Sequence, residues 1–210
     1  ATVVVSGISY LSYLLKRYVF RESGVLVSGI IGGLYSSTAT ISVLARKSRN
    51  AHSQEASEYV AAILFAVSML FLRFTILILI FSPTIFTSIY PYLLIMAAVA
   101  AGVAWFIHTR RKRTPDADLV EEEDDSSNPL EFKVALIFAG LFVIFTVLTH
   151  YTLIYAGTGG LNLLSFVSGF SDITPFILNL LQGTGSVAAT VVMACTMQAI
   201  ISNIVVNMCY

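Results

Sequence analysis

The chain has 210 residues, of which 57% are hydrophobic and 11% are charged, and its mean hydropathy is +0.83. Soluble domains carry about 25% charged residues, so this composition excludes an ordinary soluble domain and predicts an integral membrane protein. The formal net charge is zero, which gives no electrostatic reason to expect nucleic acid as a partner.

The apolar stretches of the chain are of two kinds. A helix needs about 20 apolar residues to cross about 30 Å of hydrocarbon. Five uninterrupted stretches meet this length: Thr2 to Phe20, Tyr59 to Phe81, Ile89 to His108, Phe132 to Tyr155 and Val187 to Cys209. Val25 to Ala45 and Leu161 to Leu181 are apolar too, but polar residues, glycine or proline interrupt them. We therefore predict an all-α polytopic membrane protein with five ordinary spanning helices and two interrupted segments that are re-entrant or broken.

The first apolar stretch, Thr2 to Phe20, has no cleavage-site pattern, so we interpret it as a structural helix rather than a signal peptide. The chain begins with Ala1 instead of Met, which suggests a fragment of a longer protein.

The first interrupted segment is basic at both ends. Lys16, Arg17 and Arg21 precede it, and Arg46, Lys47 and Arg49 follow it. Cytoplasmic loops carry an excess of Lys and Arg, so this distribution favours a segment that enters from the cytoplasm and returns to it.

Glycines and hydroxyls concentrate in the middle of this segment, in GGLYSSTAT. We expect Gly32 and Gly33 to allow a backbone break, because glycine adopts conformations that other residues avoid. The hydroxyls of Ser36, Ser37, Thr38 and Thr40 then lie near the break and are candidate ligands. The competing interpretation is helix packing, since Gly29 and Gly33 also form a G-x-x-x-G spacing.

The second uninterrupted span contains an arginine, and a charged connection follows the third. Arg73 lies about 21 Å along its helix from Tyr59, a depth at which a counter-charge or a water-filled cavity is expected, unless the side chain snorkels outward. A basic run and then an acidic run occupy the connection at 109–131, which we expect to be a cytoplasmic linker between a first membrane half, 1–108, and a second, 132–210.

The second interrupted segment contains the sequence SGFSDITPF. Gly169 and Pro175 are expected to break the helix, since proline lacks a backbone donor. Asp172 and Thr174 lie at the break. A carboxylate inside a membrane is energetically costly, so we predict that Asp172 binds a cation or a proton, pairs with Arg73, and is the best candidate for a metal ligand.

The last span contains Gln198, Ser202 and Asn203 at helical spacing. These side chains either face the break at Asp172 as part of a site or form hydrogen bonds between helices.

A weak internal repeat relates the two interrupted segments. One constant shift along the chain, which we call the repeat shift, aligns Gly33 with Gly169, Thr38 with Thr174 and Ile41 with Ile177. Because three crossings separate the two units, they would be inverted with respect to each other, which is a recurrent plan among transporters with broken helices. Seven plain helices with small residues at their crossings are the alternative.

Sequence motifs for catalysis are absent: there is no G-x-S-x-G around Ser36, no H-E-x-x-H and no P-loop. We therefore expect no enzymatic activity and no cofactor.

The stretches SGIIGGLYSSTATISVLARKSR, MLFLRF, NPLEF and SGFSDITPF, followed by SN near the end, resemble the bacterial membrane family catalogued as domain of unknown function 4010. The resemblance covers almost the whole chain. It implies a multi-pass protein of the bacterial inner membrane, in a family whose members often carry an MgtC/SapB-like domain. It also implies a second acidic residue two positions after Asp172, where this chain has Thr174.

The sequence thus predicts transport of a small ion or polar solute, with a divalent cation as one option. The alternative is a regulatory or assembly module that binds another membrane protein or a second copy of itself. The expected binding residues are Ser36, Ser37, Thr38, Thr40, Asp172, Thr174, Arg73, Gln198, Ser202 and Asn203. The expected partners are the lipid bilayer, the solute, an MgtC-like domain and, in a homo-oligomer, further copies.

Overall fold

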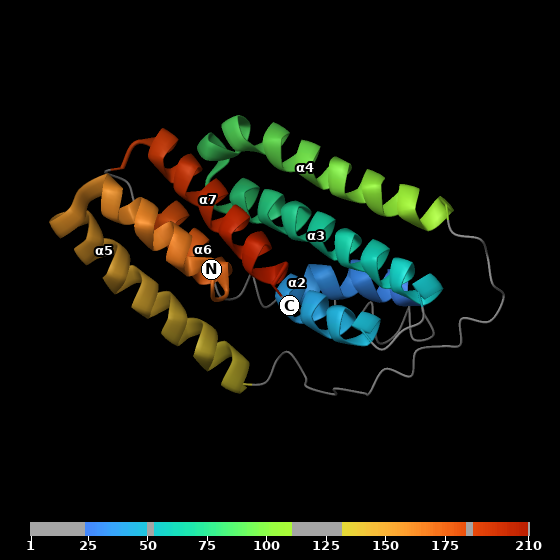
Figure 1. Cartoon of the computed structure of the whole chain (residues 1–210). Coiled ribbons are helices and arrows are strands. Elements are labelled where there is room, and N and C mark those ends of the chain that lie inside the picture. The colour runs from blue at the N-terminus through green and yellow to red at the C-terminus, as the bar shows by residue number, and fades with distance from the viewer. Residues whose placement is uncertain (1–23, 50–52, 111–131, 184–186, 210) are drawn as a thin grey trace. The chain divides into compact units, whose positions relative to one another are not determined.

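The computed structural model describes residues 24–49, 53–110, 132–183 and 187–209. All regular secondary structure in these ranges is helical (Figure 1). The helices are α2 (Val25–Arg49), α3 (Ser53–Phe81), α4 (Pro83–Arg110), α5 (Phe132–Ser168), α6 (Ile173–Gly183) and α7 (Ala189–Asn207). The predicted first span and most of the predicted linker lie outside the described residues.

Within the described ranges, four helical segments are long and apolar enough to cross a membrane. They are Ala56–Phe81, Pro83–Arg110, Leu136–Ser168 and Ala189–Asn207. Large apolar side chains such as Ile95, Trp105 and Ile154 remain more than 60% exposed, as expected where lipid is the solvent. The predicted class, a multi-pass helical membrane protein, is confirmed.

The described residues form two compact units. Unit 1 comprises Thr75–Pro91 together with residues 132–183 and 187–209, and unit 2 comprises residues 24–49, 53–74 and 92–110. The helices α3 and α4 contribute to both, so the units are not consecutive halves of the chain.

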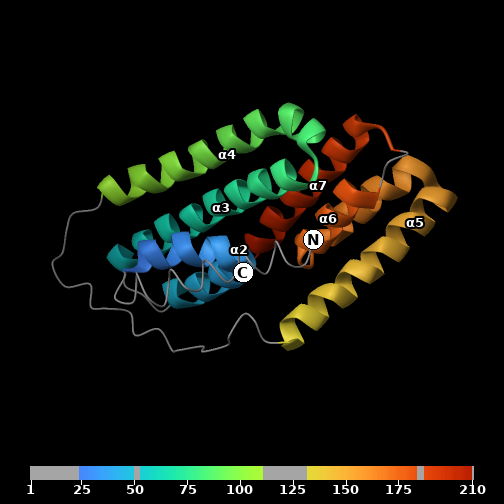
Figure 2. The same ribbon diagram turned by 180° about the vertical axis from the view of Figure 1, so that it is seen from behind.

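In unit 2, α2 folds back on itself. Ser36 has φ −153° and ψ 99°, which are extended rather than helical values, and it separates residues 25–35 from residues 37–49. A methyl group added at Gly32 would lie 2.5 Å from Oγ1 of Thr40, although eight residues of straight helix span about 12 Å. Val25 and Leu44, near the two ends, share one hydrophobic cluster. We call residues 25–49 the first hairpin (Figure 2).

The first hairpin packs closely on α3. An added Cβ at Gly29 would collide with the backbone of Ala62, and one at Gly33 would lie 2.6 Å from the Cα of Ala66. Both contacts join residues at the same separation in the chain, so this half of α2 runs parallel to α3. The prediction that Gly32 and Gly33 break the backbone is wrong: both are helical, and at Gly33 the missing side chain allows the close helix approach of a G-x-x-x-G motif.

A single non-helical residue, Ser82, joins α3 to α4. Its N–H donates to the carbonyl oxygen of Ile78 at 2.8 Å, and its own carbonyl oxygen accepts from the N–H of Phe86 at 3.0 Å. Within unit 2, the hydroxyl of Ser68 donates to the carbonyl oxygen of Ala97 at 2.9 Å. These two residues are nearly equidistant from Ser82 along the chain, so the helices run antiparallel.

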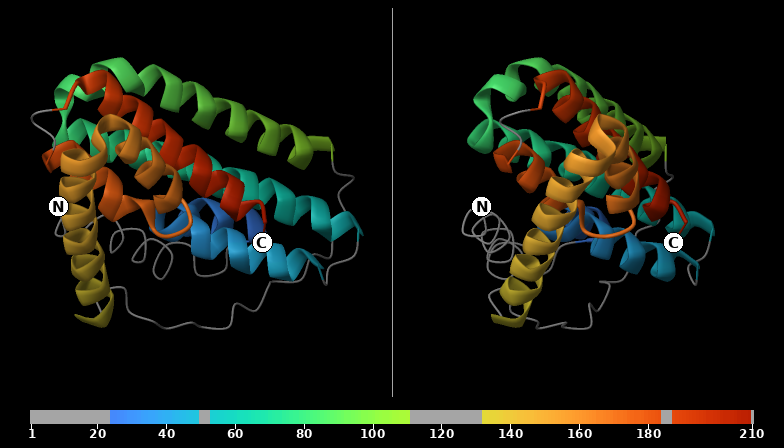
Figure 3. Two further views of the ribbon diagram at one scale, coloured as in Figure 1. Left: turned by 60° about the vertical axis from the view of Figure 1, so that its left-hand side comes forward. Right: turned by 90° about the vertical axis from the view of Figure 1, so that its left-hand side faces the viewer.

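In unit 1, α5 bends sharply at Gly157. Its φ of 57° is the one positive φ among the described residues, and it divides α5 into residues 132–156 and 158–168 (Figure 3). Residues with a Cβ are strained at such values. The sequence analysis missed this bend, because it placed the glycine run 157–160 in a loop.

Residues 158–168, a turn at 169–172 and α6 form the second hairpin, residues 158–183. Every residue of α6 from Ile173 to Leu180 is buried. On one side, the ring of Phe176 meets that of Phe145 edge-on at 5.6 Å, and the side-chain amide of Asn179 donates to Oγ1 of Thr146 at 2.6 Å. The first part of α5 thus supports the hairpin.

Candidate binding site at the helix breaks

The first break is capped by its own serine. The hydroxyl oxygen of Ser36 accepts a hydrogen bond from the backbone N–H of Ala39 at 3.4 Å, which makes Ser36 the N-cap of the second half of α2. Ser37 and Thr38 are half-buried in the first turn that follows, and Thr40 packs against Gly32. The four predicted hydroxyls therefore do lie together at one helix N-terminus.

The second break is capped by a carboxylate. Oδ1 of Asp172 accepts a hydrogen bond from the N–H of Thr174 at 3.0 Å, so Asp172 is the N-cap of α6. The N-terminal end of a helix is electrically positive, and this position favours a negative charge. The Asp172 side chain is exposed while Thr174 is buried, which leaves the second carboxylate oxygen available to a ligand.

Pro175 does not break a helix, contrary to the prediction. It lies buried in the first turn of α6, where its missing N–H has no partner to lose. Gly169, by contrast, lies in the turn itself, as predicted. A Cβ at Gly169 would collide with the side chain of Ser202 and would lie 2.8 Å from the backbone nitrogen of Asn203. The turn and α7 therefore touch at the backbone level.

Polar side chains of α7 donate hydrogen bonds to the backbone of this turn and of the helix end before it. The hydroxyl of Ser202 donates to the carbonyl oxygen of Phe166 at 2.7 Å. The amide nitrogen of Asn203 donates to the carbonyl oxygens of Gly169 at 3.1 Å and Ser171 at 3.4 Å. Both side chains are buried. Ser202 and Asn203 therefore face the break, and their hydrogen bonds run between helices.

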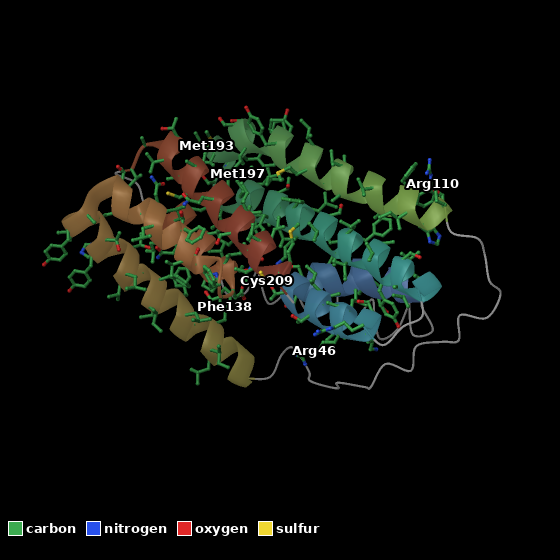
Figure 4. The ribbon with its side chains drawn as sticks, in the orientation of Figure 1. Arg46, Arg110, Phe138, Met193, Met197 and Cys209 are labelled. Atoms are coloured by element: carbon green, nitrogen blue, oxygen red, sulfur yellow. The ribbon has the colours of Figure 1, made fainter. Side chains whose placement is uncertain are left out.

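One polar residue of this cluster was missed. The amide nitrogen of Asn207 donates to Oδ1 of Asn203 at 3.1 Å, and Asn207 is 5% exposed. The i, i+4 spacing of the two asparagines was the available signal. Gln198 is half-buried on the same helix. Figure 4 labels Met193, Met197 and Cys209, which mark the course of α7.

Arg73 is half-buried on α3. It belongs to unit 2, whereas Asp172 belongs to unit 1, so the ion pair between them stays a prediction. Among the residues that the structure describes, no three His, Cys, Asp or Glu side chains come together to hold a metal ion. Among the described residues of the second break, Asp172 carries the acidic side chain.

Basic residues end the helices of unit 2. Arg46 lies in the last turn of α2 and Arg110 ends α4, where its guanidinium carbon lies 4.3 Å from the centre of the Phe106 ring (Figure 4). A guanidinium over a ring face is attracted by the ring's electrons, so this contact holds the end of α4.

The fold and the polar helix breaks define a multi-pass helical membrane protein. The sequence matches the family described as Domain of unknown function (DUF4010) over residues 3–210, and the chain belongs to this family. The predicted resemblance is thereby confirmed. No curated protein and no solved structure matches the chain.

Proposed function

We propose that the protein transports a small ion or polar solute across a bacterial inner membrane, and that each of its two helix breaks is a binding site. The observation that carries this proposal is that the chain twice leaves the helical conformation beside a long apolar helix, at Ser36 and at residues 169–172. In hydrocarbon such backbone persists only where protein or water satisfies its polar groups. Transporters commonly bind their substrates at such breaks.

The depth of the two breaks supports this proposal. Gly33 meets Ala66, ten residues after the apolar span of α3 begins at Ala56, which corresponds to about 15 Å of helix. Gly169 meets Ser202, thirteen residues after α7 begins, which corresponds to about 20 Å. In a hydrocarbon layer of about 30 Å, both hairpins would end well inside the membrane. We therefore propose that both hairpins are re-entrant.

The internal repeat also gains support from contacts. The repeat shift, which aligns Gly33 with Gly169, also aligns their contact partners, Ala66 and Ser202. It further aligns the two N-caps, Ser36 and Asp172. Seven plain helices would give no reason for these coincidences. Three crossings separate the units in this scheme, so the first hairpin would enter from the cytoplasm and the second from outside.

The chemistry at the breaks favours a cation. Asp172 brings a carboxylate, and the hydroxyls at the first break are neutral ligands. A divalent cation is one option within this proposal. The proposal includes no enzymatic step and no cofactor, and an MgtC-like domain is a proposed partner. The competing function is a regulatory or assembly module, with another membrane protein or a second copy as its partner.

Sidedness tests the re-entrant topology. In a background lacking Cys195 and Cys209, single cysteines replace Gly24 and Ser48 at the two ends of the first hairpin. An impermeant thiol reagent should label both from the cytoplasmic side of oriented vesicles. Thr84 and Thr109, exposed near opposite ends of α4, provide the control and should label from opposite sides. Labelling of Gly24→Cys and Ser48→Cys from opposite sides would remove the re-entrant hairpin.

Charge removal at Asp172 tests transport. Asparagine and serine are also good N-caps, so Asp172→Asn and Asp172→Ser remove the charge and keep the cap. We expect cation uptake into proteoliposomes to fall at least about 10-fold in both variants, which corresponds to about 1.4 kcal/mol, while the unfolding temperature in detergent stays within a few degrees. Wild-type uptake equal to that of empty liposomes, together with a stable complex with a partner, would instead favour the assembly module.

A further inference from the structure

The side-chain amides at the end of α7 form a chain with one direction. The Asn203 amide nitrogen donates to two backbone carbonyl oxygens of the turn, those of Gly169 and Ser171. Carbonyl oxygens only accept, so the NH₂ group of Asn203 must face the turn and its Oδ1 must face away. That oxygen accepts from the NH₂ group of Asn207. The orientation of the Asn207 amide follows from these contacts.

This direction leaves an oxygen at the end of the chain. Oδ1 of Asn207 is buried and accepts no hydrogen bond from any residue that the structure describes. Turning the Asn207 amide around would bring two oxygens face to face, so the group left over is necessarily an acceptor. Buried polar atoms are rarely left without a partner, and such an atom in a native structure calls for a ligand or a donor.

We propose that Oδ1 of Asn207 is a ligand for the cation that the protein transports. This inference rests on the proposed function and sets the sign of the cargo. Asn207 lies one helical turn, about 6 Å, beyond Asn203, which holds the turn that carries Asp172. Amide and carboxylate oxygens are the ligands that alkali and alkaline-earth cations prefer, whereas an anion would meet an oxygen with no donor.

The chain of amides also explains why Asn207 suits this task. Its side chain is held by the hydrogen bond to Asn203, which is itself fixed by two backbone carbonyls. A ligand that is held in place loses little conformational freedom when the ion binds. The same chain connects Asn207 to the turn, so ion binding at Asn207 and the position of Asp172 are coupled through Asn203.

Cation binding to the purified full chain tests the proposal. The unfolding temperature in detergent is measured in titrations with NaCl, KCl, MgCl₂ and CaCl₂, with choline chloride as the control for ionic strength. A cation that binds only the native state raises the unfolding temperature. We expect at least one of the four salts to do so, and choline chloride not to. In Asn207→Leu, which has a similar volume but no oxygen, the half-maximal concentration should rise at least about 10-fold.

Two results would overturn the proposal. The first is a half-maximal concentration in Asn207→Leu equal to that of the wild type, even if the unfolding temperature without salt has dropped, because this pattern describes a purely structural asparagine. The second is a wild-type protein that responds to none of the four cations. Should Asn207→Leu fail to fold, Asn207→Ala decides: it also removes the oxygen, so the half-maximal concentration should rise at least about 10-fold, and an unchanged value contradicts the proposal.

This experiment separates the inference from the proposed function. Cation binding that depends on Asn207, without uptake into wild-type proteoliposomes, would keep the binding site and remove transport. Uptake of the same cation with an unchanged titration of Asn207→Leu would keep transport and remove the role of Asn207.

Discussion

The two hairpins share a plan but are held in place differently. In each, a glycine touches the long helix that follows the hairpin in the chain, and three residues later an N-cap begins the returning half: Gly33 and Ser36 in the first, Gly169 and Asp172 in the second. The long helices differ at the contact. α7 presents Ser202 and Asn203 to the turn, and the repeat shift aligns these with Ala66 and Val67 of α3.

The two breaks differ in charge and in the hydrogen bonds that hold them. Aliphatic side chains cannot donate hydrogen bonds, so Ala66 and Val67 cannot hold the first break as Ser202 and Asn203 hold the second. The second break therefore has both a charge and side-chain hydrogen bonds from α7. This combination is what a fixed cation site requires, because preorganised ligands bind more tightly. The first break is neutral, and the close contact of α2 with α3 is what positions it.

The largest loss of stability is expected from a substitution at Gly169, where the turn contacts the backbone of α7. Gly169→Ala would force a methyl group into Ser202 and Asn203, and overpacking typically costs about 1–3 kcal/mol. In a chain of this size each kcal/mol lowers the unfolding temperature by about 2–4 °C, so we expect it to fall by about 2–12 °C. Gly140→Ala is the matched control, since nothing lies within 4 Å of its added methyl group. An equal response of both variants would contradict the contact.

The next largest loss of stability is expected when the α7 residues that contact the second hairpin are replaced by their counterparts in α3. Asn203→Val copies Val67 of α3 and leaves the carbonyl oxygens of Gly169 and Ser171 without their donor. Losing the partner of a buried acceptor costs about 1–3 kcal/mol. Ser202→Ala copies Ala66 and removes one bond, at about 1 kcal/mol. The unfolding temperature of Asn203→Val should be lower than that of Ser202→Ala. The reverse order would mean that Ser202 contributes more than Asn203 to fixing the turn.

Much of this comparison could be predicted from the sequence, because polarity in an apolar stretch is a strong signal. The membrane class, the turn at Gly169 and the polar face of α7 at Ser202 and Asn203 were all predicted. The structural role of each glycine was not predicted. Gly33 allows a close contact and Gly157 adopts a positive φ, two roles that look the same in a sequence because only the neighbouring helix or the backbone angle distinguishes them.

Asn207 shows a second limit. Its importance depends on which way the Asn203 amide points, and that direction is set by the carbonyl groups of Gly169 and Ser171, which are distant along the chain. The sequence shows two asparagines one turn apart and no more. The N-cap role of Asp172 was missed for another reason: the same residue was interpreted as a buried charge, which hid its ordinary local role at the start of α6.

Removing the caps should give a moderate and similar loss in both hairpins. Asp172→Ala and Ser36→Ala each delete the side-chain acceptor for the first turn of a helix, at about 1 kcal/mol. Asp172→Ser keeps the acceptor and should recover most of the stability without recovering cation uptake. Thermal unfolding measured beside uptake checks both parts. Uptake that follows stability across these variants would mean that the charge of Asp172 has no role of its own.

The smallest change in stability is expected from giving the first hairpin the cap of the second. Ser36→Asp keeps a good N-cap, and the helix terminus favours the new charge by about 0.3–1 kcal/mol. Ser36 is half-buried, so partial desolvation opposes this gain, and we expect a net change within about 0.5 kcal/mol. A loss above about 2 kcal/mol in thermal unfolding would show that desolvation dominates and that the first break is drier than the second. The two hairpins would then share their geometry but not their solvent, and only the second could hold an ion by charge.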